Sequence, residues 1–104
     1  MKLKYPKKIT IGSTDFKIKY DKTNSGGSFT FDNPLITIGT YDLQHGNDIY
    51  VFMIMCHEIM EVINTMSCTR YHCPGDTDFK FFMSHKEFRT NIELFATAIR
   101  NFIE

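Results

Sequence analysis

Polar and apolar residues alternate over the first forty positions, and this pattern predicts β-strands. Residues 16–20 alternate between apolar side chains and lysines, residues 28–32 alternate around two phenylalanines, and residues 35–39 form a short apolar stretch. Turn-forming residues separate the expected strands at 12–13, 24–27 and 33–34. We therefore expect the N-terminal part to form a small antiparallel β-sheet.

A helix is predicted from about residue 46–48 to about residue 66. Asn47 or Asp48 can supply its N-cap, because a short polar side chain accepts a hydrogen bond from the first free amides. Apolar residues recur at helical spacing and are expected to face the core: positions 49, 52, 53, 56, 59, 60, 63 and 66.

A second helix is predicted to begin at Ser84, since Ser84 and Glu87 have the spacing of a capping box. An apolar stripe then continues to the C-terminus: Phe88, Ile92, Phe95, Ile99 and Phe102. Residues 67–83, between the two helices, show no regular pattern. The predicted fold class is α+β, with a small antiparallel sheet followed by two long helices in a single domain over residues 1–104.

Composition narrows the function classes. The 104 residues carry no formal net charge, so nothing in the overall charge favours nucleic acid or an anionic membrane. The apolar run at 49–56 is too short to span a bilayer, and the first residues lack a signal-peptide pattern. Three cysteines are an odd number, which argues against a disulfide framework. We expect a cytoplasmic protein with reduced thiols.

Three ionisable residues interrupt an otherwise apolar stretch at 49–63: His57, Glu58 and Glu61. At about 100° per residue, a helix places all three on one arc. His57 and Glu61 are four residues apart, so both can reach one metal ion, while Glu58 points about 100° away from His57. In zinc hydrolases a glutamate in that position removes a proton from the metal-bound water. The spacing H-E-x-x-E is one substitution from the H-E-x-x-H zinc helix.

A catalytic zinc site usually needs a third protein ligand, and His85 at the start of the second helix is the candidate. His57, Glu61 and His85 would then hold the ion, with Glu58 as the general base. Glu93 is the alternative carboxylate ligand. Zn²⁺ is the expected ion, although two histidines and a carboxylate also suit iron, and manganese is not distinguished.

The segment 57–63, followed by Ser84-His85 and the pair Ile92-Glu93, resembles small zincin-like metallopeptidases of phages and prophages with an H-E-x-x-E helix. The match covers residues 48–103. It implies a minimal zincin-like fold, a metal on His57, Glu61 and His85, and Glu58 as base. It departs from the family pattern at Val62, where a small residue is usual, and in the long cysteine-bearing connection to His85.

Other interpretations stay open. His57 and Glu61 can form an internal hydrogen-bonded pair without metal. A structural zinc on Cys68, His72 and Cys73, with Asp76 as a fourth ligand, is a further hypothesis. The expected function is a metal-dependent hydrolase acting on a peptide or protein, which could pair with the strand at 35–39. The alternative is a non-catalytic phage-type domain that binds a host protein.

Overall fold

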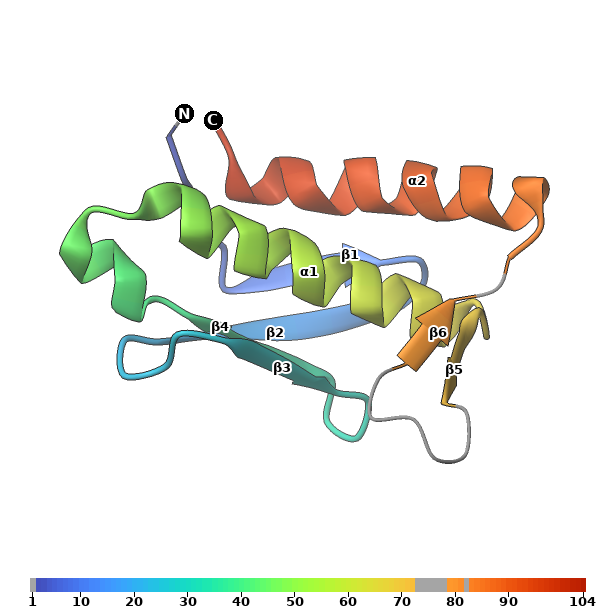
Figure 1. Cartoon of the computed structure of the whole chain (residues 1–104), viewed down its shortest axis with the longest axis horizontal. Helices are drawn as coiled ribbons and strands as arrows, with labels where there is room; N and C mark the ends of the chain where they lie inside the picture. Colours follow the sequence, from blue (N-terminus) through green and yellow to red (C-terminus); the bar gives the residue numbers. More distant parts are fainter. Residues whose placement is uncertain (1, 73–78, 82) are drawn as a thin grey trace.

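A computed structural model describes residues 2–72, 79–81 and 83–104, with nothing stated for the side chains of 70–72 and 79–81. The α+β fold class is confirmed, and Figure 1 shows two helices packed over one face of a sheet. The elements are, in chain order, β1 (Lys8–Ile11), β2 (Thr14–Asp21), β3 (Gly27–Thr30), β4 (Leu35–Gly39), the 3-10 helix η1 (Tyr41–His45), α1 (Asp48–Met66), β5 (Arg70–His72), β6 (Phe79–Phe81), α2 (His85–Ile99) and η2 (Arg100–Phe102).

Within the described residues, four strands form one mixed sheet in the order β1-β2-β4-β3. The expected antiparallel pairing holds for β1 with β2 and for β3 with β4, but β4 pairs with β2 in parallel. The reason lies in the side chains of β4. Ile36 and Ile38 are fully buried, so this apolar strand takes the centre of the sheet, while the Gly- and Ser-containing β3 lies at its edge. The tight turn between β1 and β2 uses Gly12 at a φ of 62°.

Helix α1 begins and ends where the sequence pattern predicted, and the Asn47 side chain caps it by accepting a hydrogen bond from the Tyr50 amide at 3.2 Å. The predicted buried face is only partly correct: Ile59 and Ile63 are fully buried, but other predicted positions are not. Val51, Met55 and Val62 are fully buried, whereas Ile49 and Met53 are exposed. The buried face is thus rotated by roughly 100° from the predicted one. Because nearly every residue of this run is apolar, periodicity alone could not show which side meets the sheet.

Helix α2 runs antiparallel to α1 and begins with the predicted capping box. The Glu87 carboxylate accepts from the Ser84 amide at 2.9 Å, and the Ser84 hydroxyl accepts from the Glu87 amide at 3.2 Å. The apolar stripe is only partly buried. Phe102 is fully buried and Ile99 nearly so, but Phe88 and Ile92 are exposed.

A buried polar network joins the two helices where α1 ends. The Asn91 side-chain amide donates to Asn64 Oδ1 at 3.1 Å and to Ser67 Oγ at 3.2 Å. Asn64 Oδ1 also accepts from the Thr69 hydroxyl at 2.9 Å, and the Asn64 amide donates to the Met60 carbonyl at 2.9 Å. Since buried polar groups are costly without partners, this network fixes the position of one helix along the other.

The connection between the helices is more regular than expected, because β5 and β6 pair antiparallel within it. The chain forms a compact globular unit measuring 38 × 31 × 27 Å. By length and composition alone, α1 could cross a membrane. The core helix of a globular protein meets the same test. Helix α1 lies over the sheet (Figure 1), and its buried residues belong to the hydrophobic core.

We expect Asn91→Ala to lower the free energy of unfolding by about 1–3 kcal/mol, because it removes two buried hydrogen bonds. Chemical denaturation with circular dichroism measures this change. Asn101→Ala is the matched control, since Asn101 is an exposed asparagine that bonds only to carbonyls of its own helical segment. Equal effects of the two substitutions would contradict the role given to the network.

The capping box predicts a pH dependence for the start of α2. Hydrogen bonds from the Ser84 amide and hydroxyl lower the pKa of Glu87 below its ordinary value of 4.5. The stability that Glu87 contributes is therefore present above pH 4.5 and is lost as the pH falls through the lowered pKa. Glu87→Gln should remove this part of the pH dependence of unfolding, and a carboxyl-carbon NMR titration should place the Glu87 pKa below 4.5. A normal or raised pKa would contradict the cap.

Candidate functional site

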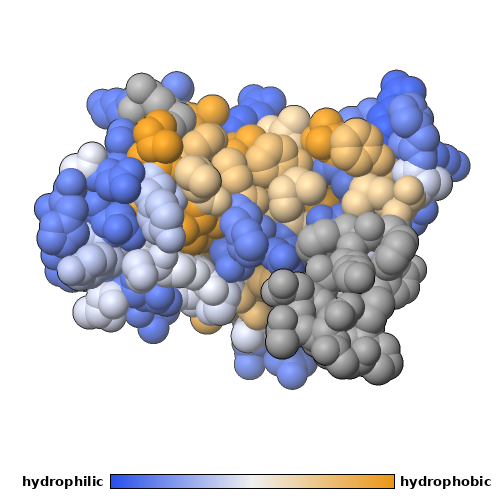
Figure 2. Space-filling model, viewed as in Figure 1, coloured by the Kyte–Doolittle hydropathy of each residue, from blue (hydrophilic) through white to orange (hydrophobic). Residues whose placement is uncertain are grey.

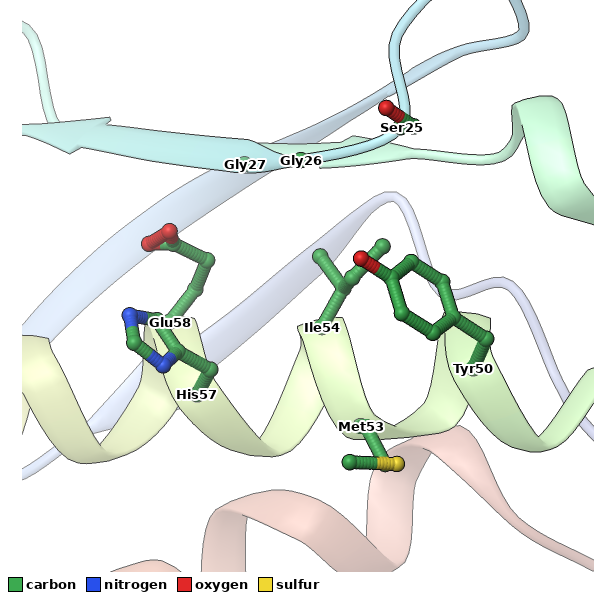
Figure 3. A pocket seen from close by; sticks show the side chains of 8 residues that line it. All are labelled: Ser25, Gly26, Gly27, Tyr50, Met53, Ile54, His57 and Glu58. Carbon is green, nitrogen blue, oxygen red and sulfur yellow. The ribbon is translucent and has the colours of Figure 1, made fainter.

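A pocket of about 310 Å³ lies between α1 and the segment that leads into β3. Figure 3 shows Tyr50 at one end of the pocket and His57 with Glu58 at the other, with Ile54 between them. The opposite wall is formed by Ser25, Gly26 and Gly27. The pocket thus combines an apolar floor with two ionisable groups at one end, an arrangement that suits a small ligand or one side chain of a larger one.

Glu58 is nearly inaccessible to solvent, with 5% of its surface exposed. It points from α1 toward β3, and its side chain lies against the backbone of Gly27 (Figure 3). A Cβ at residue 27 would stand 2.7 Å from Glu58 Cγ and 2.9 Å from the Thr37 carbonyl oxygen. A glycine is therefore required at position 27 for this carboxylate to lie beneath the sheet edge.

His57 and Glu61 lie next to each other on α1, as the spacing predicted. His57 Nε2 is 3.8 Å from Glu61 Oε1, with the His57 side chain 69% exposed and the Glu61 side chain 16% exposed. Donor atoms of a tetrahedral zinc site stand about 3.3 Å apart, so a small rotamer change would let both atoms reach one ion. The pair therefore fits two ligand positions of a metal site.

His85 is not brought to this pair. Asn91 contacts Asn64, and the helices are antiparallel. His57 lies seven residues before Asn64 on α1, and His85 lies six residues before Asn91 on α2, so they are displaced in opposite directions. At about 1.5 Å per residue their separation along the helix axes is roughly 20 Å. The alternative carboxylate, Glu93, is exposed and forms an ion pair with Arg89 at 3.6 Å.

Among the residues that the structure describes, no group of three or more His, Cys, Asp or Glu side chains could hold a metal ion. The described part of the chain thus provides two of the three expected ligands. The structural-zinc hypothesis falls mostly outside the description, because Cys73, Asp76 and the His72 side chain are not covered. Cys68 is an exposed free thiol, and Cys56 is a half-buried one whose pKa is raised by burial.

The sheet edge next to the pocket is β3, not the strand expected to pair with a peptide. Strand β4 (35–39) has neighbours on both sides, so its backbone is already used. The Gly39 amide donates to the Gly26 carbonyl at 2.7 Å, so the following residue, Gly27, directs its N–H and C=O away from β4. The edge strand beside Glu58 is therefore β3.

The sequence pattern missed two parts of this site. The turn signal at 24–27 does not indicate a role for Gly27 in the site, although a glycine at the start of a strand often marks a close approach by another group. Tyr50 belongs to the apolar pattern of the helix and does not stand out in it. It lies seven residues before His57, on the same side of α1, and that spacing could have identified it as a possible neighbour of the site.

Comparisons of the chain with family models, with curated proteins and with solved structures find no match. The assignment of the site therefore rests on its residues and their geometry.

We expect Gly27→Ala to displace Glu58 and to destabilise the fold by about 1–3 kcal/mol, because the added methyl group meets both the Glu58 side chain and the cross-strand carbonyl. Gly26→Ala is the matched control, since a Cβ there meets no atom closer than 3.6 Å. Thermal and chemical unfolding of the two variants measure the difference. If both variants were as stable as the wild type, the close contact between Gly27 and Glu58 would be wrong.

Proposed function

We propose that this chain is a metal-dependent hydrolase of peptide bonds. The observation that carries the proposal is the placement of an H-E-x-x-E helix beneath a sheet edge, with Glu58 and His57 at one end of a pocket. His57 and Glu61 would hold the ion, and Glu58 would take a proton from the attacking water. When bound, a divalent ion supplies Lewis-acid polarisation and lowers the pKa of water.

Burial of Glu58 supports its role as base. A carboxylate removed from bulk water and held against a strand is fixed in direction, so it can accept a proton from a positioned water without first reorganising. His57, the preceding residue of α1, is exposed enough to meet an ion or a substrate. His57 and Glu58 thus have different environments, which suits a metal ligand and a general base respectively.

The position of β3 supports a peptide as substrate. An extended peptide can add to a sheet edge through backbone hydrogen bonds, and Gly27 directs its amide and carbonyl outward there. A peptide in that position would pass over Glu58 and could place one side chain in the pocket, against Ile54 and Tyr50. The apolar floor favours an apolar side chain at that point.

Metal content is the first test. Elemental analysis of the purified protein should find about one divalent ion per chain, and His57→Ala and Glu61→Ala should lose it. His85→Ala should keep the metal, given its distance from His57, whereas loss of metal in this variant would restore His85 as the third ligand. His72→Ala tests the histidine of the connecting segment in the same way. A wild-type protein that takes up no added Zn²⁺, Fe²⁺ or Mn²⁺ would overturn the metal site.

Catalysis is tested separately with Glu58→Gln, which keeps the size of the side chain but cannot accept the proton. On a fluorescence-quenched peptide library, kcat/KM should fall by about 100-fold or more while the metal content stays unchanged. Glu93→Gln, on the exposed side of α2, is the control. Equal activity of the wild type and Glu58→Gln would exclude Glu58 as the base.

A second candidate function is peptide or protein binding without catalysis, for example to a host protein of a phage. The same edge strand and pocket favour it, because neither needs a metal to hold a peptide. Binding of library peptides by a wild type that cleaves none of them would select this function. For both candidates we propose a cytoplasmic location, in keeping with the free thiols of Cys56 and Cys68.

A further inference from the structure

The pocket lies where one more strand would continue the sheet. The four-stranded sheet ends at β3, and α1 packs over β3 and β4 while α2 packs over β1. Around α1, Ile54, Tyr50 and His57 follow Glu58 on the side away from the core, within an arc of about 100°. Because Glu58 lies against Gly27, this arc faces the space beside β3, one strand spacing of about 4.8 Å further out. A strand added to β3 would therefore lie under the pocket side of α1.

Gly27 fixes the register of such a strand. Its N–H and C=O point away from β4, so they are directed at the added strand. A Cβ at residue 27 would stand 2.7 Å from Glu58 Cγ, so this position faces α1. Residues directly opposite each other in paired strands carry their side chains on the same face. The peptide residue that pairs with Gly27 therefore directs its side chain into the pocket, and its two neighbours direct theirs to the outer face of the sheet.

The lining of the pocket suits an aromatic side chain. Tyr50 and Met53 line it, although 42% and 59% of their surfaces are exposed. Figure 3 shows the side chains of Tyr50 and Ile54 extending from α1 toward the segment before β3. An aromatic ring packs favourably against a tyrosine ring and against a methionine sulfur. The volume of about 310 Å³ is at the lower end of the range for ligand pockets, roughly 300–1,000 Å³, so it fits one large side chain.

We propose that the pocket selects peptides with an aromatic residue opposite Gly27, and that Tyr50 determines this specificity. The specificity rests on the proposed function, in which such a peptide is the substrate of the site at Glu58. The ring would pack against Tyr50, and the end of the pocket at His57 and Glu58 would remain for the chemistry.

The edge of β3 favours a peptide over a free aromatic compound as the occupant. A small ligand would fill the pocket but would leave the N–H and C=O of Gly27 to water, whereas a peptide strand pairs with both. Ser28 and Thr30 are exposed on the outer face of β3, where the neighbours of the aromatic residue would lie. Since that face is open to water, we expect no preference at the two neighbouring positions.

Selection of random heptapeptides by phage display tests the specificity. The bait is the full chain with Glu58→Gln, which does not cleave what it binds, and we expect Phe, Tyr or Trp at one position. Tyr50→Ala in this bait should weaken binding of a selected peptide by about tenfold. Tyr41→Ala is the matched control, because Tyr41 is 43% exposed but does not line the pocket. Circular dichroism shows that each variant is folded. Peptides without an aromatic preference, or equal effects of the two substitutions, would overturn the proposal.

Amide hydrogen exchange followed by NMR tests the register. With saturating peptide, the Gly27 amide should exchange more slowly by about tenfold or more. The Ser28 amide, which faces β4 by the alternation of the strand, is the internal control and should not change. An unprotected Gly27 amide would overturn the strand pairing. N-acetylphenylalanine amide that binds as tightly as the selected peptide would also overturn it, and would assign the pocket to a small aromatic ligand.

Failure of the specificity can be distinguished from failure of the proposed hydrolase. If the chain binds the selected peptides through Tyr50 but the wild type cleaves none of them with added Zn²⁺, the hydrolase is wrong and the specificity is supported. Cleavage of peptides that lack an aromatic residue, unchanged in Tyr50→Ala, would overturn the specificity and support the hydrolase.

Discussion

The position of α2 along α1 is the constraint on which much of the molecule depends, and the polar network around Asn64 and Asn91 sets it. An apolar contact between two helices tolerates a shift by one turn at modest cost, since many side chains fit many grooves. A buried amide does not, because any shift leaves it without its hydrogen bonds. The network therefore determines which residues of α2 can approach α1, and it keeps the start of α2 away from His57.

The sequence predicted the elements of the fold better than their arrangement. Turn residues and alternating side chains placed the four N-terminal strands, and an N-cap at the start of each helix placed both helices. The order of the strands was harder to predict, because no local pattern shows that β4 lies between β2 and β3. The buried side of α1 could not be predicted, since a helix that is apolar all round has no unique inner face.

The candidate site, too, could be predicted from the sequence only in part. The pair His57 and Glu61 follows from spacing on one helix, so the sequence was sufficient to predict it. The placement of Glu58 depends on Gly27, which belongs to a strand thirty-one positions earlier, and no helical pattern contains that information. His85 was assigned to the site on the assumption that the start of the second helix faces the middle of the first. The hydrogen bond between Asn64 and Asn91 instead keeps the start of α2 away from the middle of α1. Sequence patterns assign asparagine to the surface, so this contact was not predicted.

The apolar character of α1 on all sides has a single physical explanation if both of its faces are used. One face packs on the sheet and forms the core with residues such as Val51 and Met55. The other carries Ile49 and Met53, which no folding requirement of the isolated chain explains, because polar side chains there would cost nothing in packing. This apolar composition on both faces is what makes α1 resemble a membrane span. Met53 also lines the pocket, so the apolar side of α1 away from the sheet continues into the candidate site beside His57.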